Sequence, residues 1–220
     1  MTPQIIESRD GSHTLFVAEL NETYHSKLGA IRESQHVFID NGLKHICKNA
    51  IAILEVGMGT GLNVLLTALN RTNEQLISYT ALEPFPLTSD LIKALNYCSM
   101  LKVDSQLYER IHLCAMNVEQ ELVPAFFLRK ELSRFQAYET QTKFDLIYYD
   151  AFAWHAQPDL WQAEMMKKCN RLLNSGGVLV TYCSKSSVQK DLIASGFAIE
   201  KLTGPPGKRE MLRATKTHNL

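Results

Sequence analysis

The chain has 220 residues, of which 45% are hydrophobic and 21% are charged, and its formal net charge is zero. This length and composition fit one soluble domain with a sizeable core, and no apolar run approaches the roughly 18 residues that a membrane span needs. The balanced charge excludes an overall positive electrostatic field of the kind that indicates a nucleic-acid partner. We expect a single domain over residues 1–220 in the cytoplasm, because no basic and then apolar leader pattern opens the sequence.

The N-terminal 50 residues read as a small extension to a larger core. Residues 14–17 follow the turn Asp10-Gly11 and predict a short strand, and residues 32–49 have the apolar spacing of a helix. The cysteines are scattered, odd in number and free of CxxC spacing, so we expect buried thiols, no disulfide framework and no metal site. The five are Cys47, Cys98, Cys114, Cys169 and Cys183.

Residues 51–63 carry the most informative motif of the chain. An apolar run breaks into Gly57, Gly59 and Gly61 and then resumes as a helical pattern, which predicts a buried strand, a tight turn and a helix start. Glycine suits such a turn because a side chain would keep the backbone away from a ligand. The dinucleotide fingerprint GxGxxG needs a glycine where this chain has Leu62. The spacing GxGxG after Glu55 resembles the first motif of class I S-adenosylmethionine (SAM) methyltransferases.

Strands and helices alternate from residue 51 onward, which predicts an α/β fold with a parallel sheet and helices on both faces. The predicted strands are 51–56, 76–83, 110–115, 144–150, 177–183, 197–203 and 210–216. The predicted helices are 61–70, 88–100, 124–136, 158–173 and 186–195. The last two strands are joined by residues 204–207 without a helix, so we expect them to be antiparallel. A seven-stranded, mostly parallel sheet with one reversed strand over residues 51–220 is similar to the Rossmann-like class I methyltransferase fold.

Three polar residues end predicted strands, where ligands bind in open parallel sheets. Glu83 follows Gly61 by 22 residues, near the spacing at which an acid binds a ribose in dinucleotide folds, although an acid before Pro84 also suits a loop. Asn117 offers a carbonyl acceptor to an adenine amino group, and asparagine is equally common in turns. Asp150 ends a strongly apolar strand and could meet a methyl acceptor or cap a turn.

Four separated motifs together resemble one narrower family. They are residues 57–63 (GMGTGLN), residues 150–153 (DAFA) with 158–161 (PDLW), the early Tyr24-His25-Ser26 with 29–30 and 33–34, and residues 204–211 (GPPGKREM). The sequence is identified as a member of the bacterial tRNA wobble-uridine methyltransferases, which form the methyltransferase half of the bifunctional enzyme MnmC and its stand-alone form. Trp154 stands where this family usually has proline, and Asn117 where it usually has an acid.

The resemblance implies SAM as cofactor, tRNA as partner through its anticodon stem-loop, and methylation of the 5-aminomethyl group of a wobble (2-thio)uridine. The residues that it implies for the cofactor are Glu55, Gly57, Gly59, Gly61, Asn63, Glu83, Asn117 and Asp150. Those that it implies for the RNA are Tyr24, Phe152, Lys208, Arg209 and Arg213. We expect no flavin oxidase domain, because 220 residues leave no room for it.

Asp150 is the predicted catalytic residue. It would accept a hydrogen bond from the substrate amine, orient it and stabilise the positive charge that develops on nitrogen. A carboxylate with a pKa of about 4 is a poor final proton acceptor, so full general-base action would need a raised pKa or a water relay.

Two other readings stay open. The same fold serves methyltransferases and aminopropyltransferases that act on small amines, although the latter typically need several acids and only Asp150 is obvious here. A SAM-fold protein could also bind RNA or a partner without catalysis. The excess of basic residues in 201–220 favours RNA over a small amine, unless these residues form a solvated tail.

Overall fold

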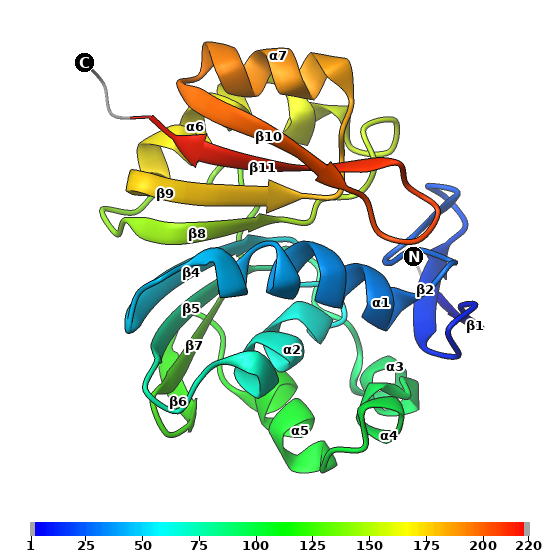
Figure 1. The fold of residues 1–220 in the computed structure, drawn as a ribbon. Coiled ribbons are helices and arrows are strands. Elements are labelled where there is room, and N and C mark those ends of the chain that lie inside the picture. The colour runs from blue at the N-terminus through cyan, green and yellow to red at the C-terminus, as the bar shows by residue number, and fades with distance from the viewer. Residues whose placement is uncertain (1–2, 218–220) are drawn as a thin grey trace.

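A twisted sheet of eight strands crosses the centre of the structure, a computed structural model that describes residues 3–217 (Figure 1). The strand order is β10-β11-β9-β8-β4-β5-β7-β6. In chain order the strands are β4 (Ala50–Val56), β5 (Leu76–Leu82), β6 (Glu119–Val123), β7 (Phe126–Glu131), β8 (Phe144–Tyr149), β9 (Leu173–Thr181), β10 (Phe197–Thr203) and β11 (Glu210–Lys216).

The expected α/β sheet is confirmed, but it has eight strands and not seven. Strands β7, β5, β4, β8 and β9 pair in parallel, and β11 runs antiparallel to both of its neighbours, as the sequence predicts. The additional strand β6 pairs antiparallel with β7 at the sheet edge. Six of the seven expected strand ranges hold strands of this sheet, β7 stands in place of the expected strand 110–115, and β6 widens the sheet on one side.

The predictions for residues 110–115 and 124–136 are wrong. Helix α5 (Ser105–Leu113) covers most of the first range, because Asp104 accepts a hydrogen bond from the Gln106 N–H and caps it, while Tyr108 and Ile111 are buried at helical spacing. Strand β7 occupies the second range, where buried and half-buried residues alternate with the period of a strand.

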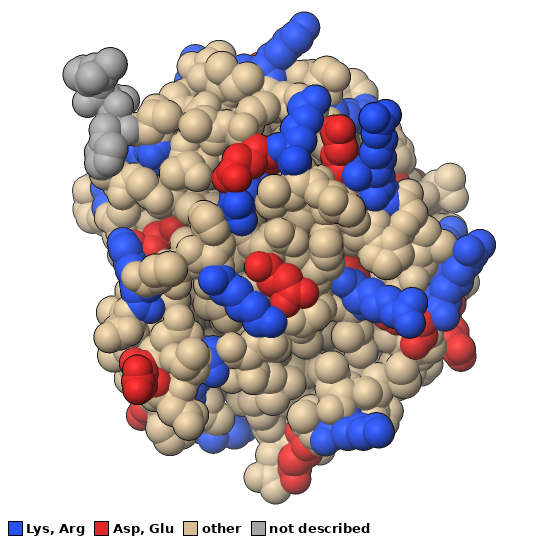
Figure 2. All heavy atoms as spheres, in the orientation of Figure 1, with Lys and Arg blue, Asp and Glu red and all other residues tan. Residues whose placement is uncertain are grey.

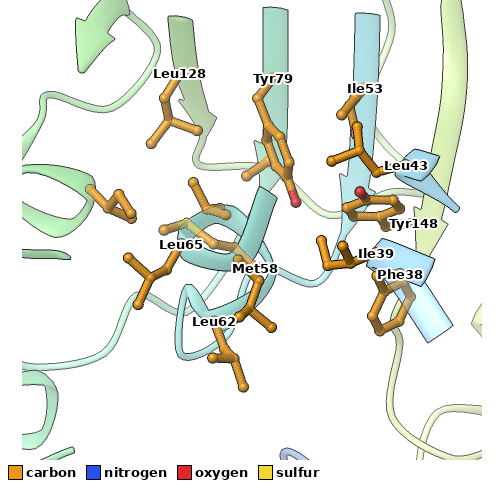
Figure 3. Packing of buried hydrophobic residues seen from close by; sticks show 14 of the residues in the cluster. Phe38, Ile39, Leu43, Ile53, Met58, Leu62, Leu65, Tyr79, Leu128 and Tyr148 are labelled. Atoms are coloured by element: carbon orange, nitrogen blue, oxygen red, sulfur yellow. The ribbon is translucent and has the colours of Figure 1, made fainter. Parts of the chain in front are cut away.

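Helices cover both faces of the sheet (Figure 1). One face carries α1 (Ala30–Ser34), η1 (Gln35–Asp40), η2 (Leu43–His45), α2 (Leu62–Asn70), α3 (Ser89–Ala94), α4 (Tyr97–Leu101) and α5, and the other carries η3 (Pro158–Trp161), α6 (Ala163–Leu172) and α7 (Ser186–Ala194). Alternate residues of one strand enter the two separate cores. In β4, Ile53 packs with the α2 side and Leu54 with the α6 side. Figure 3 shows the first core, where Tyr79, Ile53 and Tyr148 of three neighbouring strands point toward α2 and η1.

The N-terminal extension forms a small sheet of its own and then a broken helix. Strands β1 (Gln4–Glu7), β2 (His13–Val17) and β3 (Glu22–Thr23) pair antiparallel, so the predicted strand 14–17 lies within β2. The predicted helix 32–49 is divided into α1, η1 and η2; it is interrupted at residues 41–42 and ends early at His45. In Figure 1 this blue segment lies beside the red loop between β10 and β11.

The surface is mixed in charge on the face that Figure 2 shows, where lysine and arginine are interspersed with acids. Cys114, Cys169 and Cys183 are buried as expected, whereas Cys47 is exposed because it lies in the loop before β4. Within residues 3–217, none of the helices combines the length and apolar character that crossing a membrane requires.

Candidate functional site

A pocket of about 300 Å³ opens at the carboxyl ends of β4, β5 and β8. This is the edge at which open parallel sheets bind ligands. Its walls come from five segments: Tyr24 and His25, residues 56–59, residues 82–85, residues 133–136, and residues 150–152 with 156–160. Four of the five contain residues that the sequence singles out for the cofactor or the substrate.

The glycine loop approaches its neighbours too closely for any side chain. Gly57 has a φ of 90°, and a Cβ there would lie 2.8 Å from the carbonyl oxygen of Asp150. At Gly59, with a φ of 51°, a Cβ would lie 2.8 Å from the ring of Tyr24. Both glycines line the pocket, so the loop leaves its backbone open to a ligand as the motif predicts. This is a cradle that fits a nucleoside-containing cofactor.

Three residues clamp the middle of this loop through Thr60. The Thr60 carbonyl accepts hydrogen bonds from the Tyr108 hydroxyl at 2.7 Å and from His112 Nε2 at 3.1 Å. The Thr60 hydroxyl lies 2.7 Å from His25 Nε2. Burial lowers the pKa of His25 to about 4 and that of His112 to about 4, so both rings are neutral near pH 7. The loop is therefore held by three uncharged partners from two separate segments, His25 of the N-terminal extension and Tyr108 with His112 of α5.

Glu83 lies at the pocket wall immediately after β5, with both carboxylate oxygens engaged by backbone groups. Oε2 accepts the Gly59 N–H at 2.8 Å and Oε1 accepts the Phe85 N–H at 2.8 Å. Burial raises the pKa of Glu83, and these two hydrogen bonds oppose that shift. Each oxygen keeps capacity for a second donor, which suits a pair of ribose hydroxyls.

Asp150 follows β8 and reaches the same pocket from the other side of the glycine loop. Asn63 Nδ2 donates to Asp150 Oδ2 at 2.9 Å and also to Glu55 Oε1 at 2.9 Å. Burial, followed by the charge of Glu33, raises the pKa of Asp150 to about 7, while Asn63 and Lys208 oppose the shift. Burial also raises the pKa of Glu55 well above its usual value. Asn63 thus orients Asp150. Because its raised pKa favours the protonated form of Glu55, Glu55 does not place a second negative charge next to Asp150.

Two aromatic rings close the pocket next to Asp150. Tyr24 and Phe152 meet edge to face with 5.0 Å between ring centroids, and both line the pocket. Burial, followed by the charge of Glu83, raises the pKa of Tyr24 to about 12, so its hydroxyl stays protonated. The sequence predicts both rings as substrate contacts, and the structure brings them together with the predicted catalytic acid.

The basic residues near the C-terminus are part of the fold and do not form a solvated tail. Lys208 Nζ lies 2.7 Å from Glu33 Oε2 and 3.7 Å from the ring centroid of Tyr182. Arg213 pairs with both carboxylate oxygens of Glu200 at 2.9 Å. Arg209 is exposed and pairs with no acid within residues 3–217. Of the three predicted phosphate contacts, only Arg209 has a guanidinium or ammonium free of an acidic partner.

The predicted cofactor residues fall into three groups. Gly57, Gly59, Glu83 and Asp150 line the pocket. Glu55, Gly61 and Asn63 lie behind it, where Gly61 begins α2 with a φ of 72°. Asn117 does not line the pocket, because the strand expected to end there is helix α5; its Oδ1 accepts the Leu132 N–H at 3.1 Å.

The residues that follow β7 line the pocket where the sequence predicts Asn117 as the adenine contact. These residues were not identified from the sequence. Residues 133–136 line the pocket, and the guanidinium of Arg134 lies 5.2 Å from the ring centroid of Phe85, another lining residue. The alternation of buried and half-buried residues over 126–131 could have identified them. It marks the strand that pairs in parallel with β5, and the loop after that strand lines the pocket.

Comparison with known proteins bears on the chemistry of this pocket. A family model described as S-adenosyl-L-methionine-dependent methyltransferase matches residues 100–217, more than half of the 220 residues. The chain belongs to this family. It is therefore a methyltransferase with SAM as its cofactor. The glycine cradle and the Glu83 carboxylate could hold the nucleoside part of that cofactor.

Individual relatives of this methyltransferase agree with the narrower resemblance. The bifunctional protein MnmC of Aeromonas salmonicida, named for tRNA 5-methylaminomethyl-2-thiouridine biosynthesis, is 30% identical over 89% of this chain and 33% of its own length. The protein of the same name from Pseudoalteromonas atlantica is 27% identical over 96% of this chain and 33% of its own. The chain spans about a third of the length of these relatives.

A solved structure of an MnmC-type protein has the same fold over almost the whole chain. The crystal structure of MNMC2 from Aquifex aeolicus superposes with a TM-score of 0.78 at 25% sequence identity, covering 99% of this chain and 72% of that one. The resemblance to MnmC-type methyltransferases that the four sequence motifs predict is thereby confirmed.

Proposed function

We propose that this methyltransferase acts on tRNA, where it methylates the 5-aminomethyl group of a wobble (2-thio)uridine in the anticodon stem-loop to give 5-methylaminomethyl-(2-thio)uridine. The observation that carries the proposal is Asp150, a carboxyl group with a pKa raised to about 7 in a pocket with two aromatic rings. The names of the relatives in tRNA 5-methylaminomethyl-2-thiouridine biosynthesis support the choice of substrate.

The bound cofactor would supply a methyl group on a positively charged sulfur. Gly57 and Gly59 would let the backbone approach the nucleoside, and Glu83 would accept hydrogen bonds from its ribose. The walls formed by Phe85 and Arg134 lie at the carboxyl ends of β5 and β7 and suit a flat adenine ring. Asp150 would face the opposite side of the glycine loop, where the acceptor amine must enter.

Asp150 would prepare the amine for attack. An alkyl amine is mostly protonated in neutral water, and the ammonium form has no lone pair with which to attack a methyl group. A carboxylate of ordinary pKa is a weak acceptor for that proton, whereas burial of Asp150 brings its pKa to about 7. Asp150 would accept the proton from nitrogen, orient the lone pair and release the proton to solvent after transfer.

Tyr24 and Phe152 would hold the uracil ring while the amine reacts. Unstacked RNA bases are commonly bound against aromatic faces, and these two rings lie directly beside the catalytic acid. Their T-shaped contact presents two aromatic surfaces to the same pocket. Aromatic walls of this kind suit a planar nucleobase.

The test is transfer of labelled methyl from SAM to tRNA that lacks the modification, followed by nucleoside analysis. We expect label in 5-methylaminomethyl-(2-thio)uridine only. Asp150→Asn should lower kcat by at least about a hundred-fold, the scale of a lost general base, and leave SAM binding by calorimetry within a few-fold of wild type. Label at another nucleoside, or near wild-type turnover by Asp150→Asn, would contradict the proposal.

A further inference from the structure

An exposed tryptophan stands at the rim of the pocket with a lysine against it. The chain has two tryptophans, and they differ sharply: Trp161 is 2% exposed and Trp154 is 41% exposed. Lys185 Nζ lies 4.3 Å from the ring centroid of Trp154. Burying a large aromatic ring is favourable by itself, so a ring kept this open beside a binding pocket calls for an explanation.

The loop that carries Trp154 is held in place from several sides. Phe152 N–H donates to Gln157 Oε1 at 3.1 Å, Gln157 N–H donates to the Ala153 carbonyl at 3.0 Å, and Trp161 Nε1 donates to the Phe152 carbonyl at 2.8 Å. Trp154 therefore belongs to a preformed turn.

The same turn divides its aromatic residues between the inside and the outside of the pocket. Phe152 and Ala156 line the pocket on either side of Trp154 in sequence, so the Trp154 backbone lies within about 8 Å of lining residues. His155, the next residue, pairs with Glu22 of the N-terminal hairpin at 2.7 Å, which fixes the turn against β3. One ring of the turn enters the pocket and the other stands at its rim.

The charge next to the ring is available to a ligand. Lys185 is exposed, and no acid pairs with it in the part of the chain that the structure describes. Within the same residues, no second aromatic ring packs on Trp154 and its indole nitrogen makes no hydrogen bond. Lys185 lies over the Trp154 ring, which is still 41% exposed. A partly exposed ring combined with a cation that no acid pairs with matches a nucleotide, whose base stacks and whose phosphate is anionic.

We propose that Trp154 and Lys185 form a second RNA subsite, in which Trp154 stacks on a base next to the methylated uridine and Lys185 contacts the neighbouring phosphate. This subsite rests on the proposed function and assigns it a substrate contact outside the catalytic pocket. It holds the nucleotide next to the target uridine while the target base turns into the pocket. The subsite therefore lowers KM without taking part in the chemistry.

Tryptophan fluorescence tests the subsite without requiring turnover. The probe is an anticodon stem-loop RNA that lacks the modification, titrated onto the protein in saturating S-adenosylhomocysteine. Since Trp161 is buried, the difference between wild type and Trp154→Phe reports Trp154. We expect RNA to quench this difference signal, and a fully duplex RNA to leave it unchanged. No quench at a concentration of stem-loop that saturates binding overturns the subsite.

Kinetics give the second readout. Trp154→Ala should raise KM for the stem-loop by about 5- to 150-fold, the range that corresponds to loss of one stacked base, with kcat and SAM affinity unchanged. Trp154→Phe should recover most of this loss, because phenylalanine also offers a π-face. Lys185→Ala, at the N-cap of α7, should reduce the slope of log KM against log salt by about one phosphate contact. Lys190→Ala, within α7, should leave that slope unchanged.

The two readouts separate the subsite from the proposed function. Quenching of Trp154 by RNA that never becomes methylated would support the subsite and remove the proposed reaction. Methylation at the wobble uridine with an unchanged KM in Trp154→Ala would support the proposed reaction and overturn the subsite. Leu113→Ala, which truncates another exposed apolar residue at the end of α5, serves as the control for non-specific effects.

Discussion

At the scale of the residue, the balance of charge around Asp150 decides what the site can do. Glu33 raises the pKa of Asp150 and Lys208 lowers it, while Asn63 fixes the carboxylate by donating to it. Burial is the largest influence of all. The protein therefore keeps at its pocket an acid that is close to half ionised at neutral pH, which is the condition for efficient proton transfer near pH 7.

Replacing Asp150 by asparagine should stabilise the fold in a pH-dependent way. The pKa of this carboxyl rises from 3.8 to about 7 on folding, so the folded state favours the protonated form. The free energy of unfolding of the wild type therefore falls as pH rises from about 4 through 7. Asp150→Asn has no carboxyl group at this position and does not show that fall. We expect Asp150→Asn to melt at least about 2 °C above wild type at pH 8, and the gain to vanish near pH 4. A pH-independent difference in Tm would contradict the assigned shift.

How well single residues could be predicted depended on where their partners lie in the sequence. Gly57, Gly59, Glu83 and Asp150 end strands or follow them, so local pattern and the rule for parallel sheets are sufficient to bring them together. The ion pair of Lys208 with Glu33 spans 175 residues, and no local signal predicts it. The charge of Lys208 was visible in the sequence, but its use inside the fold was not.

At the scale of the element, the turn between β4 and α2 limits what the site tolerates. Its three glycines all have positive φ, and each meets a different neighbour: the Asp150 backbone, the Tyr24 ring or the His112 ring. Backbone atoms cannot move aside as flexible side chains can. Gly57, which faces the Asp150 carbonyl, is therefore the least replaceable of the three.

Gly57→Ala and Gly176→Ala form a matched pair for this turn. Both residues have positive φ, at 90° and 72°, but a Cβ on Gly176 meets nothing within 4 Å. Gly176→Ala should cost about 1–2 kcal/mol of unfolding free energy from backbone strain alone. Gly57→Ala should cost clearly more and also weaken SAM binding at least about ten-fold. Equal losses of stability, with SAM affinity unchanged, would show that the contact with Asp150 is unimportant.

Elements with strong periodicity were predicted closely, and one hairpin was not. Strands β10 and β11 have the predicted bounds 197–203 and 210–216. The β6–β7 hairpin was missed because its two-residue turn is Pro124-Ala125, with Ala125 at a φ of 59° and no glycine or asparagine to mark it. This error moved the third strand by about fifteen residues and with it the predicted adenine contact.

At the scale of the whole molecule, the pocket joins the first and last parts of the chain. Tyr24 and His25 of the N-terminal extension line it, and Glu33 of the same extension holds the loop between β10 and β11 through Lys208. His36 Nε2 lies 2.7 Å from the Thr203 carbonyl in the same region. The extension, expected as an appendage, therefore forms one wall of the site.

Breaking this connection should cost stability. Glu33 is 8% exposed and Lys208 is 33% exposed, so Lys208→Met would leave a buried carboxylate without its partner. We expect a loss of about 1–3 kcal/mol of unfolding free energy, less than for a fully buried pair because Lys208 is partly solvated. Lys44→Met, which breaks the exposed pair with Asp40, should lose at most about 0.5 kcal/mol. Urea unfolding of both variants measures the difference, and equal losses would contradict the argument.

The ion pair that spans 175 residues also has a consequence for protein synthesis. A ribosome that adds about 5–20 residues per second makes Glu33 roughly 10–35 s before Lys208. During that interval the nascent chain can form the glycine loop, but the wall that carries Tyr24 lacks its C-terminal anchor. Methyl transfer should therefore begin only after synthesis has passed the β10–β11 loop, so that an incomplete chain does not compete with finished copies for the methyl acceptor.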